Sequence, residues 1–228
     1  MRTGRVLEVC DRCISLMPAL EAPVCVSCGA PFQGVPSLDA KAREEDGGGR
    51  RCVDCRGKRR HWLLARAFYA YEGPARGMVT ALKYSGRRRM AKTMATLAWA
   101  ARGPARDAIE GAACVVAVPL HASRQAARGY NQSAELAREL ATLAGLPFLE
   151  DVLERTRDTR PQVGLKREER RENVRDAFAV DRADEIASRE VLLVDDVMTT
   201  GATLSECARE LKAAGAGGIR ALCFARDL

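Results

Sequence analysis

The sequence has few aromatic residues and no long hydrophobic run, and both shortages limit what it can be. Aromatics make up 5% of the 228 residues, so any core must consist mainly of aliphatic side chains. No segment approaches the ~20 consecutive apolar residues that a membrane-spanning helix needs, and the nearest, Thr93–Ala101, is short and rich in alanine. Met1–Val9 is too short and too polar for the apolar core of a secretory signal. We therefore expect a soluble, cytoplasmic protein with no membrane partner.

Positive charge and cysteine are present in excess. The 37 Lys and Arg residues outnumber the 30 Asp and Glu residues, which gives a net charge of +7. Such a balance favours an anionic partner, either a phosphorylated small molecule or a nucleic acid, although an arginine-rich surface also serves solubility alone. In a reducing compartment we expect the nine cysteines to be metal ligands or free thiols rather than disulfides.

The distribution of cysteine divides the chain into two parts. Six cysteines form three Cys-x-x-Cys pairs within the first 55 residues, and a basic connector, Arg56–His61, follows them. From Trp62 onward, short apolar runs alternate with amphipathic helical segments, which is typical of βαβ units. The sequence thus predicts a cysteine-rich module over residues 1–61 and an α/β domain over residues 62–228, with a parallel sheet flanked by helices.

Hydrophobic periodicity, glycine and proline predict the individual elements. The expected helices are Pro74–Tyr84, Ser133–Ala144 and Thr203–Ala214, and the expected strands are Leu63–Tyr71, Val115–Leu120, Val191–Val194 and Ile219–Phe224. Between the second and third cysteine pairs, Pro36–Arg51 is rich in glycine and is expected to form a solvent-exposed loop.

The segment Val191–Leu204 carries most of the functional information. A buried strand runs into Asp195 and Asp196, and a turn of small hydroxyl residues with a glycine leads into a helix. Such a turn at the carboxyl end of a parallel strand is where α/β folds bind ligands, and its amides and helix dipole favour a phosphate. The carboxylates suit ribose hydroxyls or the water shell of Mg²⁺. The candidate binding residues are Asp195, Asp196, Thr199, Thr200, Gly201, Ala202 and Thr203.

A simple helix cap is the structural alternative for this segment, because Thr203 and Glu206 have the spacing of a capping box. A cap would not explain two adjacent acidic residues at the end of a strand. The whole segment closely resembles the 5-phosphoribosyl-1-pyrophosphate (PRPP) signature of type I phosphoribosyltransferases. That resemblance implies a type I phosphoribosyltransferase-like fold that binds PRPP with Mg²⁺, and a reaction in which pyrophosphate is displaced from the ribose C1.

The same resemblance implies two further loops around the pyrophosphate. One follows the strand that leads into Val116–His121, and the other is a mobile basic loop within Arg155–Arg175. For the latter, a solvated helix of mixed charge over Lys166–Arg175 is an equal alternative. The residues implied in these loops are Pro119, Leu120, His121, Arg124, Arg128, Gln162, Lys166 and Arg170.

Several features together narrow the resemblance to the ComF family of bacteria, which contains competence protein F and GntX-type proteins. They are the cysteine module, Leu82–Tyr84, Arg128–Gln132, the Gln162, Arg170 and Asn173 pattern, and Val194–Asp196. The resemblance implies a link to DNA uptake, with single-stranded DNA or a competence helicase as partner, or a phosphoribosyl transfer to an acceptor that the sequence does not name.

One feature favours a non-catalytic alternative. The chain stops just after its last expected strand, so a hood that recognises the acceptor must come from residues before about 115 or from a partner. A PRPP sensor, or an adaptor for single-stranded DNA or a helicase, is therefore the second hypothesis.

The three cysteine pairs predict zinc, because two Cys-x-x-Cys pairs complete a tetrahedral site. Family members often have a fourth pair, and we expect that Met1 lies downstream of the true start. The complete site would then use Cys25, Cys28, Cys52 and Cys55, and would leave Cys10 and Cys13 without partners. A rival pairing joins the first two pairs. A redox dithiol is the third alternative, although the thioredoxin-like context is absent.

Overall fold

The computed structural model describes residues 7–32, 50–58, 60–101, 103–160 and 164–228. Gln162 and most of the loop expected at Pro36–Arg51 lie outside these residues. Across the described ranges, no helix combines the length and the apolar character needed to cross a membrane. The helices are α1 (Asp11–Ser15), α3 (Gly73–Tyr84), α4 (Met90–Ala100), α5 (Arg106–Ile109), α6 (Ala122–Arg128), α7 (Gln132–Ala144), α8 (Arg167–Val174) and α9 (Ala202–Ala213), with a 3-10 turn η1 (Ala183–Glu185).

A four-stranded parallel sheet organises the molecule, and it confirms the predicted fold class. Its strand order is β1–β6–β5–β2, formed by β1 (Leu64–Ala70), β2 (Cys114–Ala117), β5 (Glu190–Met198) and β6 (Gly218–Arg226). The central strand β5 is paired on both sides, for example Val194 with Leu222 of β6 and with Ala117 of β2. A separate antiparallel pair joins β3 (Leu153–Arg155) to β4 (Phe178–Val180).

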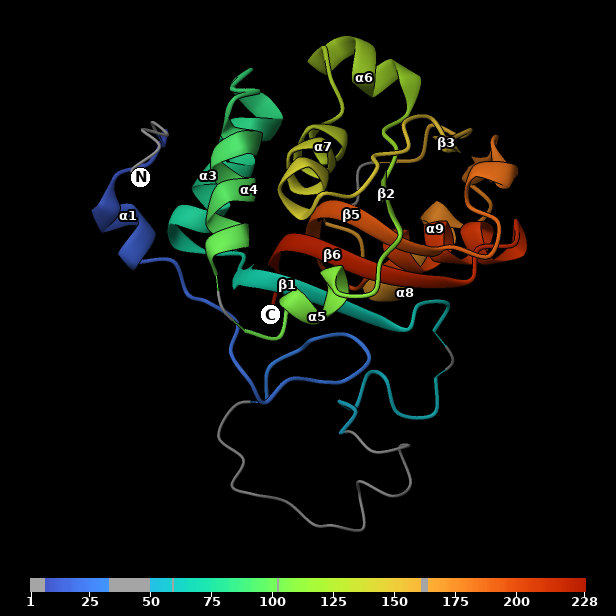
Figure 1. Cartoon of the computed structure of the whole chain (residues 1–228), viewed down its shortest axis with the longest axis horizontal. Coiled ribbons are helices and arrows are strands. Elements are labelled where there is room, and N and C mark those ends of the chain that lie inside the picture. The colour runs from blue at the N-terminus through green and yellow to red at the C-terminus, as the bar shows by residue number, and fades with distance from the viewer. Residues whose placement is uncertain (1–6, 33–49, 59, 102, 161–163) are drawn as a thin grey trace.

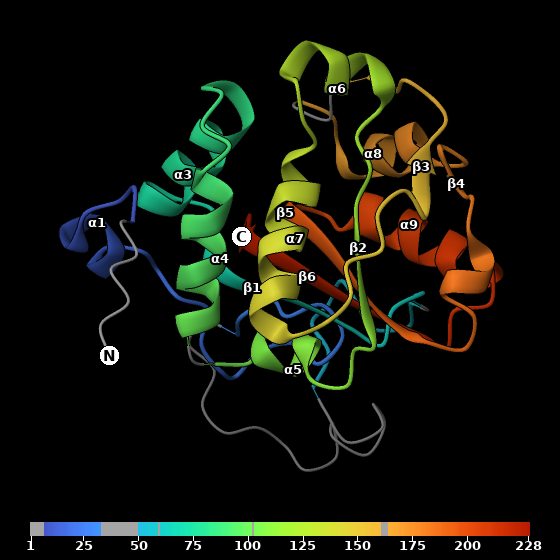
Figure 2. The same cartoon turned by 45° about the horizontal axis from the view of Figure 1, so that its top comes forward.

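Alternating side chains of the sheet enter two hydrophobic layers. Leu192, Val194 and Phe224 pack with residues of α3, α4 and α7, which lie together on one face (Figures 1 and 2). Val191 and Leu193 pack on the other face with residues of α9 and of the cysteine module. Both faces of a parallel sheet are buried in this arrangement, which explains the near-continuous apolar runs of β5 and β6.

The cysteine module packs directly against the sheet edge formed by β1. The Leu20 amide donates to the Phe68 carbonyl at 2.9 Å, and the Ala65 amide donates to the Ser27 carbonyl at 2.8 Å. Gly29 has a positive φ of 70°, and a Cβ there would lie 2.7 Å from the Ala65 carbonyl oxygen, so this close approach needs glycine. The domain boundary at residue 61 stays a prediction, and residues on both sides of it contribute to one core.

Two predicted strands have different bounds in the structure. The strand predicted as Val191–Val194 continues to Met198, because its ladder with β6 persists through Val197 and Ala225. Asp195 and Asp196 therefore belong to the strand instead of following it. The strand predicted as Val115–Leu120 is Cys114–Ala117, and the chain leaves the sheet just before Pro119, which has no amide hydrogen to donate.

The capping-box alternative for Thr203 is wrong, since Gly201 occupies the N-cap position of α9. Glu206 is engaged elsewhere: its Oε1 accepts from the Asp176 amide at 2.8 Å and pairs with Arg209. Within the basic segment Arg155–Arg175, a helix over Lys166–Arg175 was predicted as the alternative to a mobile loop. The structure has this helix, since α8 covers most of Lys166–Arg175.

Candidate functional site

A cavity of about 320 Å³ opens where the parallel strands end. Tyr71 follows β1, Val118–Leu120 follow β2, and Asp195–Met198 form the end of β5. The turn after β5 and the first residues of α9 close one side, and residues of α3, α6, α7 and α8 contribute the others. This position, outside the carboxyl ends of the strands, is the one that open α/β sheets use for ligands.

Two adjacent carboxylates form the floor of the cavity, and each is held by a different helix. Lys83 of α3 places its Nζ 3.0 Å from Asp196 Oδ1, and the Asp196 side chain is only 4% exposed. Ser133 of α7 donates from its hydroxyl to Asp195 Oδ1 at 2.7 Å. Within the described ranges, the buried Oδ2 of Asp196 has no hydrogen-bond donor. A ligand that donates a hydrogen bond, or a hydrated cation, would satisfy this oxygen.

The pKa values of these groups follow from burial and from their charges. Burial, reinforced by the charge of Asp196, raises the pKa of Asp195 to about 7, and the Ser133 hydrogen bond opposes that rise. Burial by itself would lower the pKa of Lys83, but the charges of Asp196 and Asp195 outweigh it and raise that pKa. The cavity therefore contains a charged lysine beside an Asp195 that binds a proton more readily than an ordinary aspartate.

The turn at Thr199–Gly201 connects the carboxylates to the start of α9. Gly201 has a positive φ of 74°, and a Cβ there would lie 3.1 Å from the Trp62 ring. Thr200 accepts a hydrogen bond at its hydroxyl oxygen from the Ala202 amide at 3.3 Å, which shapes the turn. The amides in the first turn of a helix lack intrahelical acceptors, and their dipoles favour an anion. The cavity thus has, beside its carboxylates, a turn whose amides could bind an anion; this turn is called the phosphate-type loop below.

Most of the predicted binding residues line this single cavity. From the phosphate segment they are Asp195, Asp196, Thr199, Gly201, Ala202 and Thr203, and from the other loops Pro119, Leu120, Arg124, Arg128 and Arg170. Thr200 instead lines a neighbouring cavity. Lys166 occupies the N-cap position of α8, where its amide donates to Glu169 at 2.6 Å.

His121 caps α6 and does not line the cavity. Its Nδ1 lies 2.8 Å from the Ser123 hydroxyl, which donates in turn to Asp158 at 2.8 Å. Asp158 also lies 3.4 Å from Arg124. These contacts tie the loop after β2 to the segment that follows β3.

Sequence reasoning missed several residues of the cavity. Lys83 is part of the Leu82–Tyr84 element, but the sequence alone gave it no role. No sequence pattern singled out Ser133 or Arg155 as a binding residue. Ser133 lies on a helix that was predicted only from its apolar face, and Arg155 lies on a short strand. In the described part of the chain, Arg155 Nε is buried without an acceptor, and burial lowers the pKa of this guanidinium.

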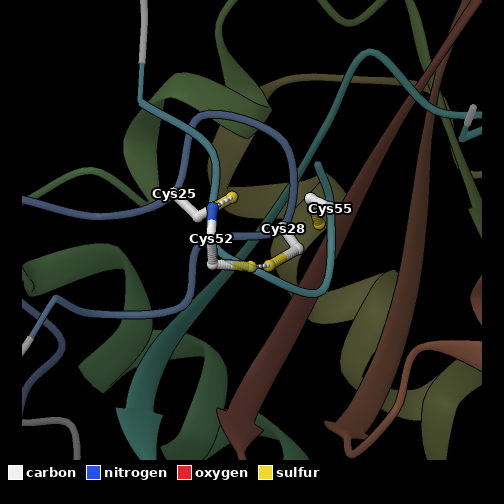
Figure 3. A group of neighbouring side chains, drawn as sticks. All are labelled: Cys25, Cys28, Cys52 and Cys55. Carbon is white, nitrogen blue, oxygen red and sulfur yellow. Dashed lines mark hydrogen bonds between the residues drawn. The ribbon is translucent and has the colours of Figure 1, made fainter. Parts of the chain in front are cut away.

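The second candidate site is the cluster of four cysteines in the N-terminal module (Figure 3). Their sulfur atoms all lie within 4.8 Å of one another, and those of Cys28 and Cys52 are 3.6 Å apart. A disulfide would need about 2.0 Å, whereas Zn–S bonds of about 2.3 Å in a tetrahedron separate sulfurs by about 3.8 Å. Hydrogen bonds from the Cys28 and Cys55 thiols lower the pKa of Cys25, which favours a thiolate. Four cysteines in this arrangement fit a zinc ribbon.

The cluster selects one of the pairings that the sequence left open. Cys25, Cys28, Cys52 and Cys55 lie together, whereas Cys10 and Cys13 lie at the start of α1 and are not part of the cluster. The rival pairing of the first two pairs is therefore wrong. His61 is exposed and is not among the clustered ligands. The isolated cysteines Cys114, Cys207 and Cys223 are buried in the hydrophobic core.

Comparison with known proteins agrees with this geometry. A phosphoribosyl transferase domain model matches residues 126–228, a range that contains β5, the turn and α9. Competence protein F of Haemophilus influenzae is 27% identical over 220 residues, which cover 95% of this chain and 96% of that protein.

Two other relatives share smaller parts of the chain. The DNA utilization protein YhgH of Escherichia coli K12 is 30% identical over 179 residues, 78% of each chain. Competence protein ComFC of Streptococcus pneumoniae is 32% identical over 111 residues, which cover 49% of this chain and 47% of that protein. From the matched domain, these relatives and the cysteine cluster, we conclude that the chain belongs to the ComF family of the type I phosphoribosyltransferase superfamily.

Proposed function

We propose that the cavity at the end of β5 binds PRPP together with Mg²⁺, and that the protein is a phosphoribosyltransferase-like protein acting in DNA uptake or utilisation. The observation that carries the proposal is the buried Asp196 Oδ2, which lacks a donor among the described residues and lies beside the turn that begins α9. It puts an unsatisfied acceptor next to a phosphate-type loop, which matches a ligand that has both hydroxyls and phosphates.

The charges around the cavity support a ligand with several negative groups. Five cationic side chains line it, against the two carboxylates of Asp195 and Asp196; the cations are Lys83, Arg124, Arg128, Arg155 and Arg170. We assign the 5-phosphate to the amides of Thr199–Thr203 and the ribose hydroxyls with the Mg²⁺ shell to the carboxylates. We assign the pyrophosphate to Arg124 and Arg128. When Asp196 binds a ribose hydroxyl or the hydrated Mg²⁺, Lys83 can leave this carboxylate and contact the phosphates.

An acceptor would lie against the wall that these groups leave free. That wall consists of Tyr71 and Tyr84, both of which precede residue 115. Displacement of pyrophosphate from C1 breaks one C–O bond and forms one bond to the acceptor. The residues of the cavity would promote it by positioning and by stabilising the charge of the leaving pyrophosphate. Turnover of PRPP with a panel of bases would separate this enzyme from a non-catalytic PRPP sensor.

For the cysteine cluster we propose one structural zinc ion. The four sulfurs have the number and spacing that a closed tetrahedral site needs. The module is also tied to the sheet, since Trp62 Nε1 donates to the Ser27 carbonyl at 2.9 Å and Arg226 donates to the Cys28 carbonyl at 2.7 Å. Metal binding would therefore stabilise the edge of the sheet as well as the module.

A groove beside the cysteine module supports the second candidate function, contact with single-stranded DNA. Lys58, Arg60, Arg171 and Arg175 line a cavity of about 360 Å³ in which Glu206 is the acidic residue. Of the three relatives described above, two are named for competence and one for DNA utilization. Such a groove suits the phosphates of a nucleic acid backbone, and a competence helicase is the alternative partner.

We expect PRPP to bind only weakly without Mg²⁺ and to lose on the order of tenfold or more in affinity on Asp196→Asn or Asp195→Asn, because hydrogen bonds to charged groups are worth that much. Isothermal calorimetry measures this directly. Asp184→Asn in the exposed turn η1 is the matched control. Equal affinity for PRPP in wild type, control and both carboxylate variants would refute the assignment of PRPP to this cavity.

Binding of Mg²⁺ and PRPP should tighten as the pH rises through about 7, because the pKa of Asp195 is about 7 and its charged form is the one that holds the ligand. Ser133→Ala removes a hydrogen bond that favours the carboxylate. We expect the midpoint to move up by about one pH unit. PRPP also titrates, but its own contribution is the same for both proteins, so an unchanged midpoint would refute the role of Asp195.

The same pKa predicts the direction of a stability change. Because the native pKa of about 7 lies above the ordinary value of 3.8, the folded protein holds a proton that the unfolded chain releases. Protonation of Asp195 therefore adds to the free energy of unfolding. This stabilising contribution is fully present below about pH 4 and is lost as the pH rises through about 7.

Purified protein should contain about one zinc ion per chain, since one closed four-cysteine site is present. Cys28→Ser should abolish zinc binding and lower the melting temperature, while Cys10→Ser should retain the metal. Elemental analysis and thermal unfolding measure the two effects. Less than about half an equivalent of zinc, with disulfides in its place, would favour the redox alternative.

Binding of single-stranded DNA should be weak, independent of sequence and steeply dependent on salt. Changing Arg56, Arg59 and Arg60 to Gln, or Arg171 and Arg175 to Gln, should lower affinity and reduce the salt slope by about 0.7 for each phosphate that the variant no longer neutralises. Arg182→Gln, at the N-cap of the turn η1, is the control. Absence of binding even at low salt would leave a protein partner or the small-molecule reaction as the function.

A further inference from the structure

The knuckle formed by Cys52 and Cys55 contains an aspartate whose position the cysteine cluster fixes. Asp54 lies between these two cysteines, and the knuckle is closed by the Cys55 and Arg56 amides, which donate to the Cys52 carbonyl at 2.9 and 3.0 Å. The side chain of Asp54 forms an ion pair with Arg167, the first residue of α8, across a separation of 113 residues. The start of α8 is thereby attached to the metal module.

This end of α8 also supplies a cation to the ligand cavity. Arg170 lies three residues after Arg167, so the two share one side of the helix. Arg170 lines the ligand cavity with Asp195 and Asp196. Arg167 and Arg170 also line a neighbouring cavity of about 520 Å³, which extends from the cysteine module to Thr199 of the phosphate-type loop. Asp54 is therefore linked through one turn of helix to a residue that faces the proposed anion.

The other end of α8 is held by different contacts. Val174 is 1% exposed and belongs to the core. The Asn173 side chain accepts from the Arg160 amide at 3.1 Å and donates to the Arg160 carbonyl at 2.9 Å. The first turn of α8 is mostly solvated, so the ion pair with Asp54 is its side-chain link to a distant segment. Loss of that link should loosen the first turn and leave the last one in place.

We propose that Asp54 is a positioning residue for the ligand cavity: through Arg167 it holds α8 so that Arg170 faces the anionic ligand. The inference depends on the proposed function for the identity of that ligand. It gives the metal module a purpose beyond stability, as the fixed support of a basic helix at the binding site.

The two effects of removing Asp54 have opposite signs, which makes the inference testable. Taking a negative charge away from an anion site should tighten binding by electrostatics alone. Removal of a positioning interaction should weaken it. Asp227 is a matched control, because it lines the same 520 Å³ cavity and has no ion-pair partner in the described part of the chain.

The test uses the full chain loaded with zinc, with PRPP and Mg²⁺ as the titrant in calorimetry. Asp54→Asn should bind about two- to fivefold more weakly than wild type, the range that a partly exposed ion pair can supply. Asp227→Asn should bind equally or more tightly. The charge-swapped double variant Asp54→Arg with Arg167→Asp should restore most of the loss. Equal or tighter binding by Asp54→Asn would overturn the inference.

A second readout does not depend on PRPP. Amide hydrogen exchange at Arg170, whose amide donates to the Lys166 carbonyl at 2.9 Å, should be faster in Asp54→Asn and in Arg167→Gln of the ligand-free protein, while exchange near Val174 and the zinc content stay unchanged. Arg167→Gln leaves the knuckle sequence intact. If Asp54→Asn loses its metal, exchange in Arg167→Gln therefore decides whether the ion pair anchors α8. Unchanged exchange in Arg167→Gln would refute the anchoring. If wild type fails to bind PRPP, the proposed function is refuted, and the hydrogen-exchange experiment still decides the anchoring.

Discussion

The placement of two adjacent carboxylates, Asp196 buried and Asp195 half-buried, at the end of the central strand β5 is the constraint on which the rest of the site depends. Buried charges are costly unless they are paired and hydrogen-bonded. Lys83 of α3 and Ser133 of α7 supply those partners from one layer of helices. The turn after β5 then puts the start of α9 beside the same carboxylates. The site is thus assembled from elements that the sheet brings together, and Asp196, with one unsatisfied acceptor among the described residues, lines a cavity with five cations.

The cysteine module is joined to this sheet by charged and aromatic side chains. Arg66 of β1 is buried, and it donates to the Val26 carbonyl at 3.0 Å, while Arg226 of β6 donates to the Cys28 carbonyl. These donors satisfy backbone oxygens of a module whose described residues include little regular hydrogen-bonded structure. A guanidinium provides several donors in a fixed plane, so a few arginines can hold an irregular segment firmly. The cysteine cluster and the cavity at the end of β5 therefore belong to one packed structure.

The same arrangement connects Asp54, in the knuckle between Cys52 and Cys55, to helix α8 at the cavity. A zinc ribbon supplies rigidity from very few residues, since four bonds to one ion replace a hydrophobic core. A protein that must place a basic helix over an anionic ligand can use such a rigid support at a small cost in length. The ion pair between Asp54 and Arg167 is the contact through which this support reaches α8.

The sequence by itself determined the features that are local in the chain. The strand, the two acids, the Thr-Thr-Gly turn and the helix after it are contiguous in Val191–Leu204, so their chemistry is visible without a structure. The alternation of strands and helices likewise predicted the parallel sheet, because side-chain periodicity is a property of each segment alone.

Tertiary structure decided everything that joins distant segments. It selected which cysteine pairs meet, extended β5 through its ladder with β6, and brought Lys83 to Asp196. It also placed His121 at a helix cap instead of in the cavity. No local pattern encodes such contacts, because a lysine on an amphipathic helix has the same sequence signature whether it meets water or a buried carboxylate. The distinction depends on how the helices pack against the sheet, and only the folded chain specifies that packing.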